Sequence, residues 1–491
     1  MSRIHDDDGP LRWLFLDFDS YFAAVEQQEN PRWRNRPLMV VPLEQAEATM
    51  AIAVSRQAKA KGVRRGMTLA QARALCPDIA VATARHEVYV RWHHRLLAEV
   101  ERHLPIDLVH SIDELSARLG RGQRQPVAAQ LLARQVKRGI ANRFGPTITC
   151  SIGLAPSRLL AKIAAEMDKP DGLRVITPAD LPDVLLPLAL EDLPGISTGI
   201  ARRLAAAGVR DVAGLWRLAP RQARAIWGTV VGERFIRALH GEDVDPPPPG
   251  PPRSFGHGRV LGPELADPQA AWPVACALLL KAAMRLRRAG MVAREVVLAV
   301  RWREDRGSRG TGIGAGVGVR TGGGADTGAG AGLHAGAAAP PAGRRLGWQP
   351  VEDAWRELLP VATADSFLLL RALERLWKAL QRAASADARG MACRAGQVWG
   401  GGHARRRLRS VHVFLACLSP ETARQLDLFA DTDARWRERE RLWAEIDRLN
   451  RRFGGRVVEP ASLKHLDLKY LGAKIAFGRV PEAADFDGAR P

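Results

Sequence analysis

The chain has 491 residues, enough for about three or four domains, and its 46% hydrophobic and 26% charged residues are typical of a globular protein. Its 73 Lys and Arg against 53 Asp and Glu give a net charge of +20, which favours a polyanionic partner such as nucleic acid. Five scattered cysteines without a CxxC pair argue against a zinc ribbon or disulfide framework. Without a signal pattern or a membrane-length apolar run, a soluble, cytoplasmic protein is expected.

Strands and helices alternate over the first 180 residues, which predicts an α/β or α+β unit. An apolar run over 11–17 ends in Asp17, as a buried strand ends at a sheet edge, and a helix follows over 20–28 with Ser20 as its cap. The next expected elements are Ala-rich helical residues 46–76 interrupted by Gly62 and Gly66, a helix over 88–104, a strand over 106–119, a strand over 147–154 and a helix over 157–168.

Residues 185–240 are predicted as short helices broken at glycines, and the proline run over 245–252 as a stiff linker. Residues 307–343 include 14 glycines among 37 residues, which predicts a flexible insertion between two strands. The remaining expected elements are helices over 267–289, 367–382 and 435–453 and strands over 292–302 and 408–415.

Two acidic pairs lie next to apolar residues at the expected strands, Asp17 with Asp19 and Asp113 with Glu114. Such carboxylates bind an ion, accept hydrogen bonds or lie at a strand edge as caps and turns, and the edge role remains an alternative. Their hard oxygen atoms suit Mg²⁺, and two such ions about 4 Å apart can serve phosphoryl transfer. Successive strand residues face opposite ways, so Asp113 and Glu114 share a site only near a turn or bulge. Asp19 is also expected to point away from Asp17.

Six motifs follow one another along the chain: Leu16-Asp-Phe-Asp-Ser-Tyr-Phe-Ala-Ala-Val-Glu26, Lys61-Gly-Val-Arg-Arg-Gly-Met67, Leu75-Cys-Pro77, Ser111-Ile-Asp-Glu114, Ala161-Lys-Ile-Ala-Ala-Glu-Met-Asp-Lys-Pro-Asp-Gly172 and Leu193-Pro-Gly-Ile196. Together they resemble the Y-family DNA polymerases, the DinB/UmuC-like translesion enzymes. The resemblance covers residues 11–300 and resumes near 408. It implies a multidomain α+β right-hand polymerase, an error-prone monomer that adds deoxynucleotides to a primer 3′-OH on primer-template DNA.

The same resemblance implies a division into domains. These are a palm over 1–45 and 85–180, fingers over 46–84, a helix-hairpin-helix thumb over 181–245, a proline-rich linker over 246–252, a little finger over 253–420 with the insertion 307–343, and a C-terminal tail over 421–491.

For the active site, the resemblance implies that Asp17, Asp113 and Glu114 hold two Mg²⁺ ions. It also implies that the backbone carbonyl of Phe18 binds the metal ion on the nucleotide side. The residues implied at the incoming deoxynucleoside triphosphate are Ser20 and Tyr21 through their backbone N–H groups, Phe22 as a steric gate against a ribose 2′-OH, and Lys169 as a cation. As alternatives, Phe22 packs in the core and Lys169 is a solvated turn lysine.

The expected fingers depart from the family pattern. Many relatives carry Thr, Tyr and Arg where this chain has Ala53, Arg56 and Lys59. Arg56 and Lys59 keep positive charge for a triphosphate, but a lysine lacks the bidentate fork of an arginine. The departure therefore puts catalytic efficiency in question rather than the metal site.

Residues 190–204 are predicted as a helix, a tight glycine turn and a second helix, which exposes backbone N–H groups to a DNA phosphate. An ordinary two-helix turn is the alternative. The DNA-contacting residues that the resemblance implies are Gly195, Gly199, Arg202, Arg203 and, at the start of the little finger, Arg253.

A short peptide beyond the last expected domain strand resembles the motif that binds the bacterial sliding clamp. It consists of Gln425, Leu426, Asp427, Leu428 and Phe429, with apolar anchors and a hydrogen-bonding Gln. The alternative is a helix fragment that packs on the little finger.

Two other functions remain open at this stage. The altered fingers and the glycine-rich insertion are compatible with a polymerase-like accessory protein that recruits other factors to damaged DNA. A nuclease or a ligase-like phosphotransferase would use the same metals. The acids Asp17, Asp113 and Glu114 favour the polymerase over the accessory protein.

Overall fold

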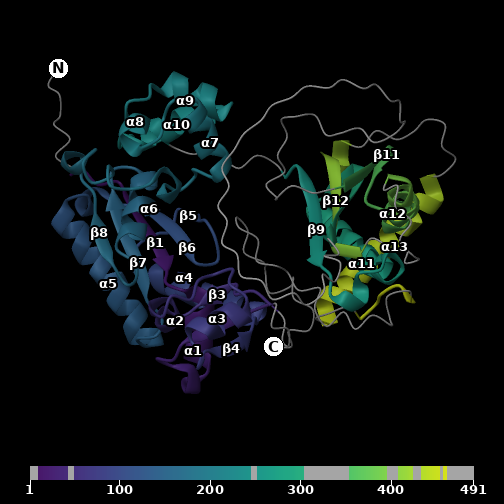
Figure 1. Cartoon of the computed structure of the whole chain (residues 1–491), viewed down its shortest axis with the longest axis horizontal. Helices are drawn as coiled ribbons and strands as arrows, with labels where there is room; N and C mark the ends of the chain where they lie inside the picture. The colour runs from purple at the N-terminus through teal and green to yellow at the C-terminus, as the bar shows by residue number, and fades with distance from the viewer. Residues whose placement is uncertain are drawn as a thin grey trace. The chain divides into compact units, whose positions relative to one another are not determined.

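The computed structural model describes residues 9–42, 49–244, 252–303, 353–394, 407–423, 433–453 and 457–461. These residues form two compact units, divided within the proline-rich segment (Figure 1). Both units combine helices with β-sheets, in line with the α+β expectation. Within the described ranges, no helix is both long enough and apolar enough to cross a membrane.

A five-stranded sheet of order β5-β6-β1-β7-β8 lies at the centre of the first unit. β7 and β8 run parallel, and the other neighbouring strands run antiparallel. All six residues of β1 are buried, because the strand lies in the middle of the sheet. The strands are β1 (Trp13–Phe18), β5 (Leu108–Val109), β6 (Glu114–Arg118), β7 (Cys150–Ala155) and β8 (Leu173–Val175).

Alternate side chains of β1 pack in two different cores. Leu14 and Leu16 pack with helices α1, α4 and α5, whereas Trp13 and Phe15 pack with α6 and with the short helices within 198–239. Asp17 follows Phe15 by two residues and therefore lies on the α6 side of the sheet. The helices are α1 (Tyr21–Glu29), α4 (His86–Val100), α5 (Pro126–Phe144) and α6 (Arg158–Met167).

Residues 46–76 are not simply helical, in contrast to the expectation, because part of them pairs in a second sheet of order β3-β2-β4. Left-handed backbone at Gly62 and Gly66, with φ of 85° and 86°, separates the two short helices of this region. The elements are β2 (Leu38–Val41), β3 (Ala53–Val54), α2 (Arg56–Ala60), α3 (Leu69–Leu75) and β4 (Ala80–Thr83).

The segment 185–240 contains the expected short helices, but a 3₁₀ turn replaces the expected helix before Gly195. Pro194 explains the difference, because proline lacks an N–H donor and disfavours helical backbone in the residue before it. Asp243, after the last helix, accepts hydrogen bonds of 2.6 Å from both Trp13 and Arg118. The helices are α7 (Thr198–Ala206), α8 (Val212–Trp216), α9 (Pro220–Trp227) and α10 (Val230–Leu239).

The second unit is a four-stranded antiparallel sheet of order β11-β10-β12-β9, packed against α11 and α12. The tail helix α13 joins this unit, because Asp447 pairs with Arg287 at 2.7 Å and Trp443 is only 5% exposed. The elements are β9 (Ser254–Val260), α11 (Pro268–Arg288), β10 (Met291–Arg303), β11 (Asp353–Thr363), α12 (Ser366–Arg394), β12 (Arg407–Pro420) and α13 (Asp433–Phe453). The glycine-rich residues 307–343 lie outside the described residues, between β10 and β11.

Gly153 in β7 allows α6 to lie close to the central sheet. A Cβ atom at this position would lie 1.9 Å from the carbonyl oxygen of Ala161 and 2.4 Å from the backbone nitrogen of Ala165. Both are backbone atoms of α6, so a change of side-chain rotamer could not relieve the overlap. Glycine at this position therefore fixes the distance between α6 and the strands β1 and β7.

Gly153→Ala is expected to lower the free energy of unfolding by about 1–3 kcal/mol, because α6 must move away from the sheet. Urea denaturation, followed through the unfolding transition of the first unit, measures the change in the free energy of unfolding. The matched control is Gly122→Ala, since a Cβ there meets nothing within 4 Å. Equal stability of the two variants would contradict the close contact.

Candidate active site

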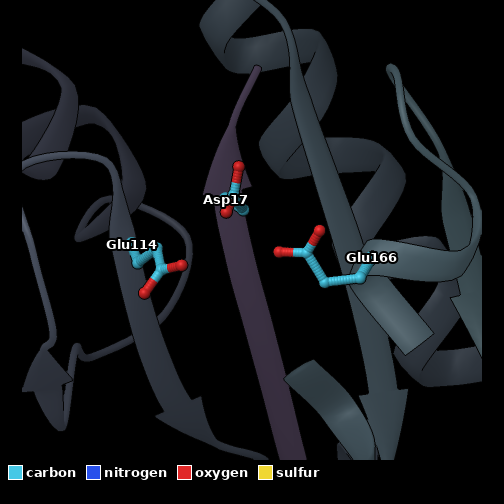
Figure 2. A group of neighbouring side chains, drawn as sticks. All are labelled: Asp17, Glu114 and Glu166. Carbon is cyan, nitrogen blue, oxygen red and sulfur yellow. The ribbon is translucent and has the colours of Figure 1, made fainter. Parts of the chain in front are cut away.

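Three carboxylates from three different elements meet on the α6 side of the sheet (Figure 2). Asp17 of β1 lies opposite Glu114 of β6 in the antiparallel register, and Glu166 comes from the end of α6. One oxygen atom of each residue lies within 4.8 Å of the others. In Figure 2 the carboxylates of Glu114 and Glu166 point toward Asp17 from opposite sides.

Two lysines neutralise this acidic cluster. The Nζ of Lys169 lies 2.8 Å from Asp17 and 2.8 Å from Glu166, and the Nζ of Lys162 lies 2.8 Å from both oxygens of Glu114. Burial raises the pKa of Asp17, and Lys169 opposes that shift. Burial lowers the pKa of Lys169, but the carboxylates of Asp17 and Glu166 outweigh burial, so its pKa is raised overall. Three carboxylates thus face two lysines, and a divalent cation could displace or join these lysines.

Asp113 lies in a bend immediately before β6, so the expected strand over 106–119 is broken into β5 and β6. The backbone N–H of Phe18 donates to the Asp113 carbonyl at 2.8 Å, and the Ser111 hydroxyl donates to the Asp113 carboxylate. Burial raises the pKa of Asp113, and the charge of Asp113 in turn raises the pKa of Asp17. Asp113 is therefore an electrostatic neighbour of the cluster, although it is not among the three acids that lie closest together.

The bend is held from behind by His93 of α4. Its Nδ1 lies 2.8 Å from the carbonyl oxygen of Ile112, the residue before Asp113. Burial lowers the pKa of His93 to about 4, so the ring is neutral at pH 7 and donates its Nδ1 proton to that carbonyl. His93 lies in no sequence motif that would mark this role.

Asp19 has a separate structural role. Its carboxylate accepts hydrogen bonds from the hydroxyls of Thr149 and Ser151, both at 2.8 Å, and from the backbone N–H of Asp171 at 2.9 Å. These three donors tie β1 to β7 and to the turn after α6. Asp19 is not part of the three-acid cluster.

The first turn of α1 follows β1 directly. Ser20 lies at the N-cap position, but its side chain makes no capping hydrogen bond, so the expected cap is wrong. The reason is its left-handed backbone, φ 50°, whereas a capping residue uses extended backbone. The first helical bond runs from Ala24 to Ser20, which leaves the N–H groups of Tyr21 and Phe22 without a partner inside the helix.

The other predicted contact residues are distributed over both units. Arg56 and Lys59 are exposed on α2, and Arg253 is exposed just before β9. Gly195 has a left-handed φ of 99° in an exposed turn, and Gly199 lies in the first turn of α7.

The two arginines of α7 differ in their surroundings. Arg202 is exposed, whereas Arg203 donates a hydrogen bond of 3.0 Å to the carbonyl of Trp227 at the end of α9. The predicted clamp-binding residues Gln425, Leu426, Leu428 and Phe429 lie outside the described residues.

Lys162 and Glu166 were missed as site residues, although both lie in a motif noted in the sequence. Lys162, Glu166 and Lys169 follow one another at spacings of four and three residues. Such spacing places the three side chains on one face of the helix and of the turn that follows it. This spacing is the sequence pattern that could have identified Lys162 and Glu166 as neighbours of Lys169.

Comparisons with known proteins give a consistent result. A model of the impB/mucB/samB family matches residues 16–166, and a model of that family's C-terminal domain matches residues 252–321. DNA polymerase IV of Moorella thermoacetica is 34% identical over 293 residues, which cover 59% of this chain and 72% of that protein. DNA polymerase IV of Alkalilimnicola ehrlichii is 30% identical over 295 residues, which cover 60% and 82%.

Among solved structures, a Y-family DNA polymerase chimera of Dbh and Dpo4 aligns with a TM-score of 0.59 and 20% identity. The alignment covers 83% of this chain and 98% of the chimera. At this level of identity the likeness concerns the fold. It confirms the expected fold class of a multidomain right-hand polymerase.

Proposed function

This chain belongs to the Y family of translesion DNA polymerases, and on that premise we propose that it extends a primer 3′-OH in an error-prone manner with two metal ions held by its acidic cluster. As a DNA-directed DNA polymerase it must bind a triphosphate and a primer end beside those acids. The observation that carries the proposal is the position of Asp17 opposite Glu114, with Glu166 beside both.

The donor atoms of the cluster fit a hard divalent cation, because they are carboxylate oxygens within 4.8 Å of one another. Asp17, Asp113 and Glu114 would hold two Mg²⁺ ions, together with the backbone carbonyl of Phe18, and Glu166 adds a fourth carboxylate. Such ions, when bound, neutralise charge on the attacking and leaving oxygens of a phosphoryl transfer.

The triphosphate binds next to the acids through cations and backbone donors of this chain. Lys169 already lies beside Asp17 and supplies the nearest positive charge. The N-terminus of α1 offers the N–H groups of Ser20 and Tyr21, a favourable place for an anion. Arg56 and Lys59 add exposed positive charge from α2.

The sheets and helices correspond to the parts of a right hand. We assign the five-stranded sheet to the palm, the three-stranded sheet to the fingers, α7–α10 to the thumb and the second unit to the little finger. Gly195, Gly199, Arg202 and Arg203 contact the DNA backbone from the thumb, and Arg253 does so from the little finger. These contacts grip phosphates and read no bases, so binding weakens steeply with salt.

Asp113→Ala is expected to reduce primer extension with Mg²⁺ by about a hundredfold or more, because a charge-stabilising group at the reacting phosphate is lost. Gel-resolved extension of a labelled primer-template measures the rate. Asp183→Ala, an exposed acid outside the cluster, is the control and retains wild-type activity. Absence of extension by the wild-type chain would refute the proposal and favour an accessory role.

Phe22→Ala is expected to increase ribonucleotide incorporation by about a hundredfold relative to deoxynucleotide incorporation, because the ring no longer excludes a 2′-OH. The measurement is kcat/KM for one matched pair of triphosphates on the same primer-template. Phe22→Tyr keeps the ring and serves as the control. Unchanged sugar selectivity in Phe22→Ala would refute the steric gate.

The peptide Gln425–Phe429 is proposed to tether this enzyme, acting as a monomer, to the bacterial sliding clamp, which raises its effective concentration at primer ends. A Leu428→Ala, Phe429→Ala double variant should lose at least about tenfold in clamp retention, since apolar anchors dominate such grooves. Pull-down with purified clamp measures retention, and Thr432→Ala is the control. Equal retention by the double variant would remove the tether.

A further inference from the structure

A second aromatic ring lies directly against Phe22. The rings of Phe22 and Tyr89 are stacked, with centroids 4.2 Å apart and planes 14° from parallel. His86 meets the Phe22 ring edge-on at 6.0 Å. Phe22 is half-buried, whereas Tyr89 is 0% exposed. The ring of Tyr89 therefore limits how far Phe22 can retreat when a substrate presses on it.

Tyr89 is itself fixed at two points. Its hydroxyl donates to Glu26 Oε1 at 2.8 Å, and its backbone carbonyl accepts from the hydroxyl of Tyr21 at 2.6 Å. Burial, together with the charge of Glu26, raises the pKa of Tyr89, so the phenol keeps the proton that it donates. Both ends of the residue are tied to α1, the helix that carries Phe22.

Glu26 is a buried carboxylate, 1% exposed, and needs a partner for its charge. Arg85 supplies it through two parallel hydrogen bonds, of 3.1 Å from Nε and 2.6 Å from Nη2. Phe22 and Glu26 are four residues apart on α1, and Arg85 and Tyr89 are four residues apart at the start of α4. Each pair thus lies on one helix face, and the contacts run from Phe22 to Tyr89, from Tyr89 to Glu26 and from Glu26 to Arg85.

From this arrangement we propose that Tyr89, held by Glu26 and Arg85, is a positioning residue that fixes Phe22 and so sets the selectivity for deoxynucleotides over ribonucleotides. A steric gate discriminates only if its side chain does not move aside for the larger sugar. The side chains packed against the gate residue supply the energy that keeps it in place. The inference rests on the proposed gate function of Phe22.

The test compares Tyr89→Leu, Tyr89→Phe and Phe22→Ala in the full-length chain. The readout is the ratio of kcat/KM for a deoxynucleotide to that for its ribonucleotide. Because both values come from one preparation, a loss of folded protein cancels. Tyr89→Leu should lower the ratio about tenfold through loss of the stacked ring and its anchor. Tyr89→Phe keeps the ring and should lower the ratio about threefold.

Leu96→Ala is the matched control, because Leu96 is fully buried on α4 in the same core, seven residues beyond Tyr89. It should lose stability and keep the wild-type ratio. A relaxed ratio in Phe22→Ala with wild-type ratios in both Tyr89 variants would overturn the support role and leave the gate intact. A wild-type ratio in Phe22→Ala would refute the gate, and the inference with it.

If Tyr89→Leu does not fold, Tyr89→Phe decides, since it changes one hydroxyl. A Leu96→Ala ratio that falls as far as that of Tyr89→Leu would also overturn the inference, because it would trace the effect to general loosening of the core.

Discussion

Repulsion among carboxylates at the ends of β1, β6 and α6 is the constraint on which the rest of the first unit depends. Asp17, Glu114 and Glu166 lie close enough to share an ion, and burial makes the charge of Asp17 costly. Two lysines form ion pairs with the acids: Lys162 pairs with Glu114, and Lys169 pairs with both Asp17 and Glu166. The surrounding fold brings these five side chains together, and the two lysines offset the repulsion among the three acids.

The sequence predicted the parts of this arrangement that depend on local pattern. An apolar run ending in acid located β1 and Asp17, and the acidic pair at 113–114 located the second strand. The requirement for a turn at Asp113 also followed from strand geometry, because adjacent side chains of a strand face opposite ways. The structure has a bend at 111–113, immediately before Glu114.

What could not be predicted depends on contacts between elements distant in the chain. Glu166 joins the acids because α6 approaches β7 at Gly153, and a glycine in a strand does not reveal what packs against it. His93 supports Asp113 through a backbone carbonyl, which carries no sequence signal. Helix α5 went unpredicted although Pro126 begins it and Gly145 ends it, because Gly139 and several arginines dilute its apolar face.

The contact between α1 and α4 also involves residues expected at the site. Phe22 follows Asp17 by five residues, so one short stretch of chain carries both an expected metal ligand and the expected gate. Helix α4 contacts that stretch through Tyr89 and the Arg85–Glu26 pair. In the role proposed for Tyr89, residues of α4 would act on Phe22 without touching a substrate.

Helix α6 has a further significance because it is sandwiched between two layers. One side packs on β1 and β7, and the other meets α10, where the Ser157 hydroxyl donates to the Ala238 carbonyl at 2.6 Å. The helix thus contacts both the strands next to the acids and the helices that we assign to the thumb. A force that DNA exerts on those helices would act on the same helix that carries Lys162 and Glu166. Grip and chemistry would then be mechanically linked through ten residues of backbone.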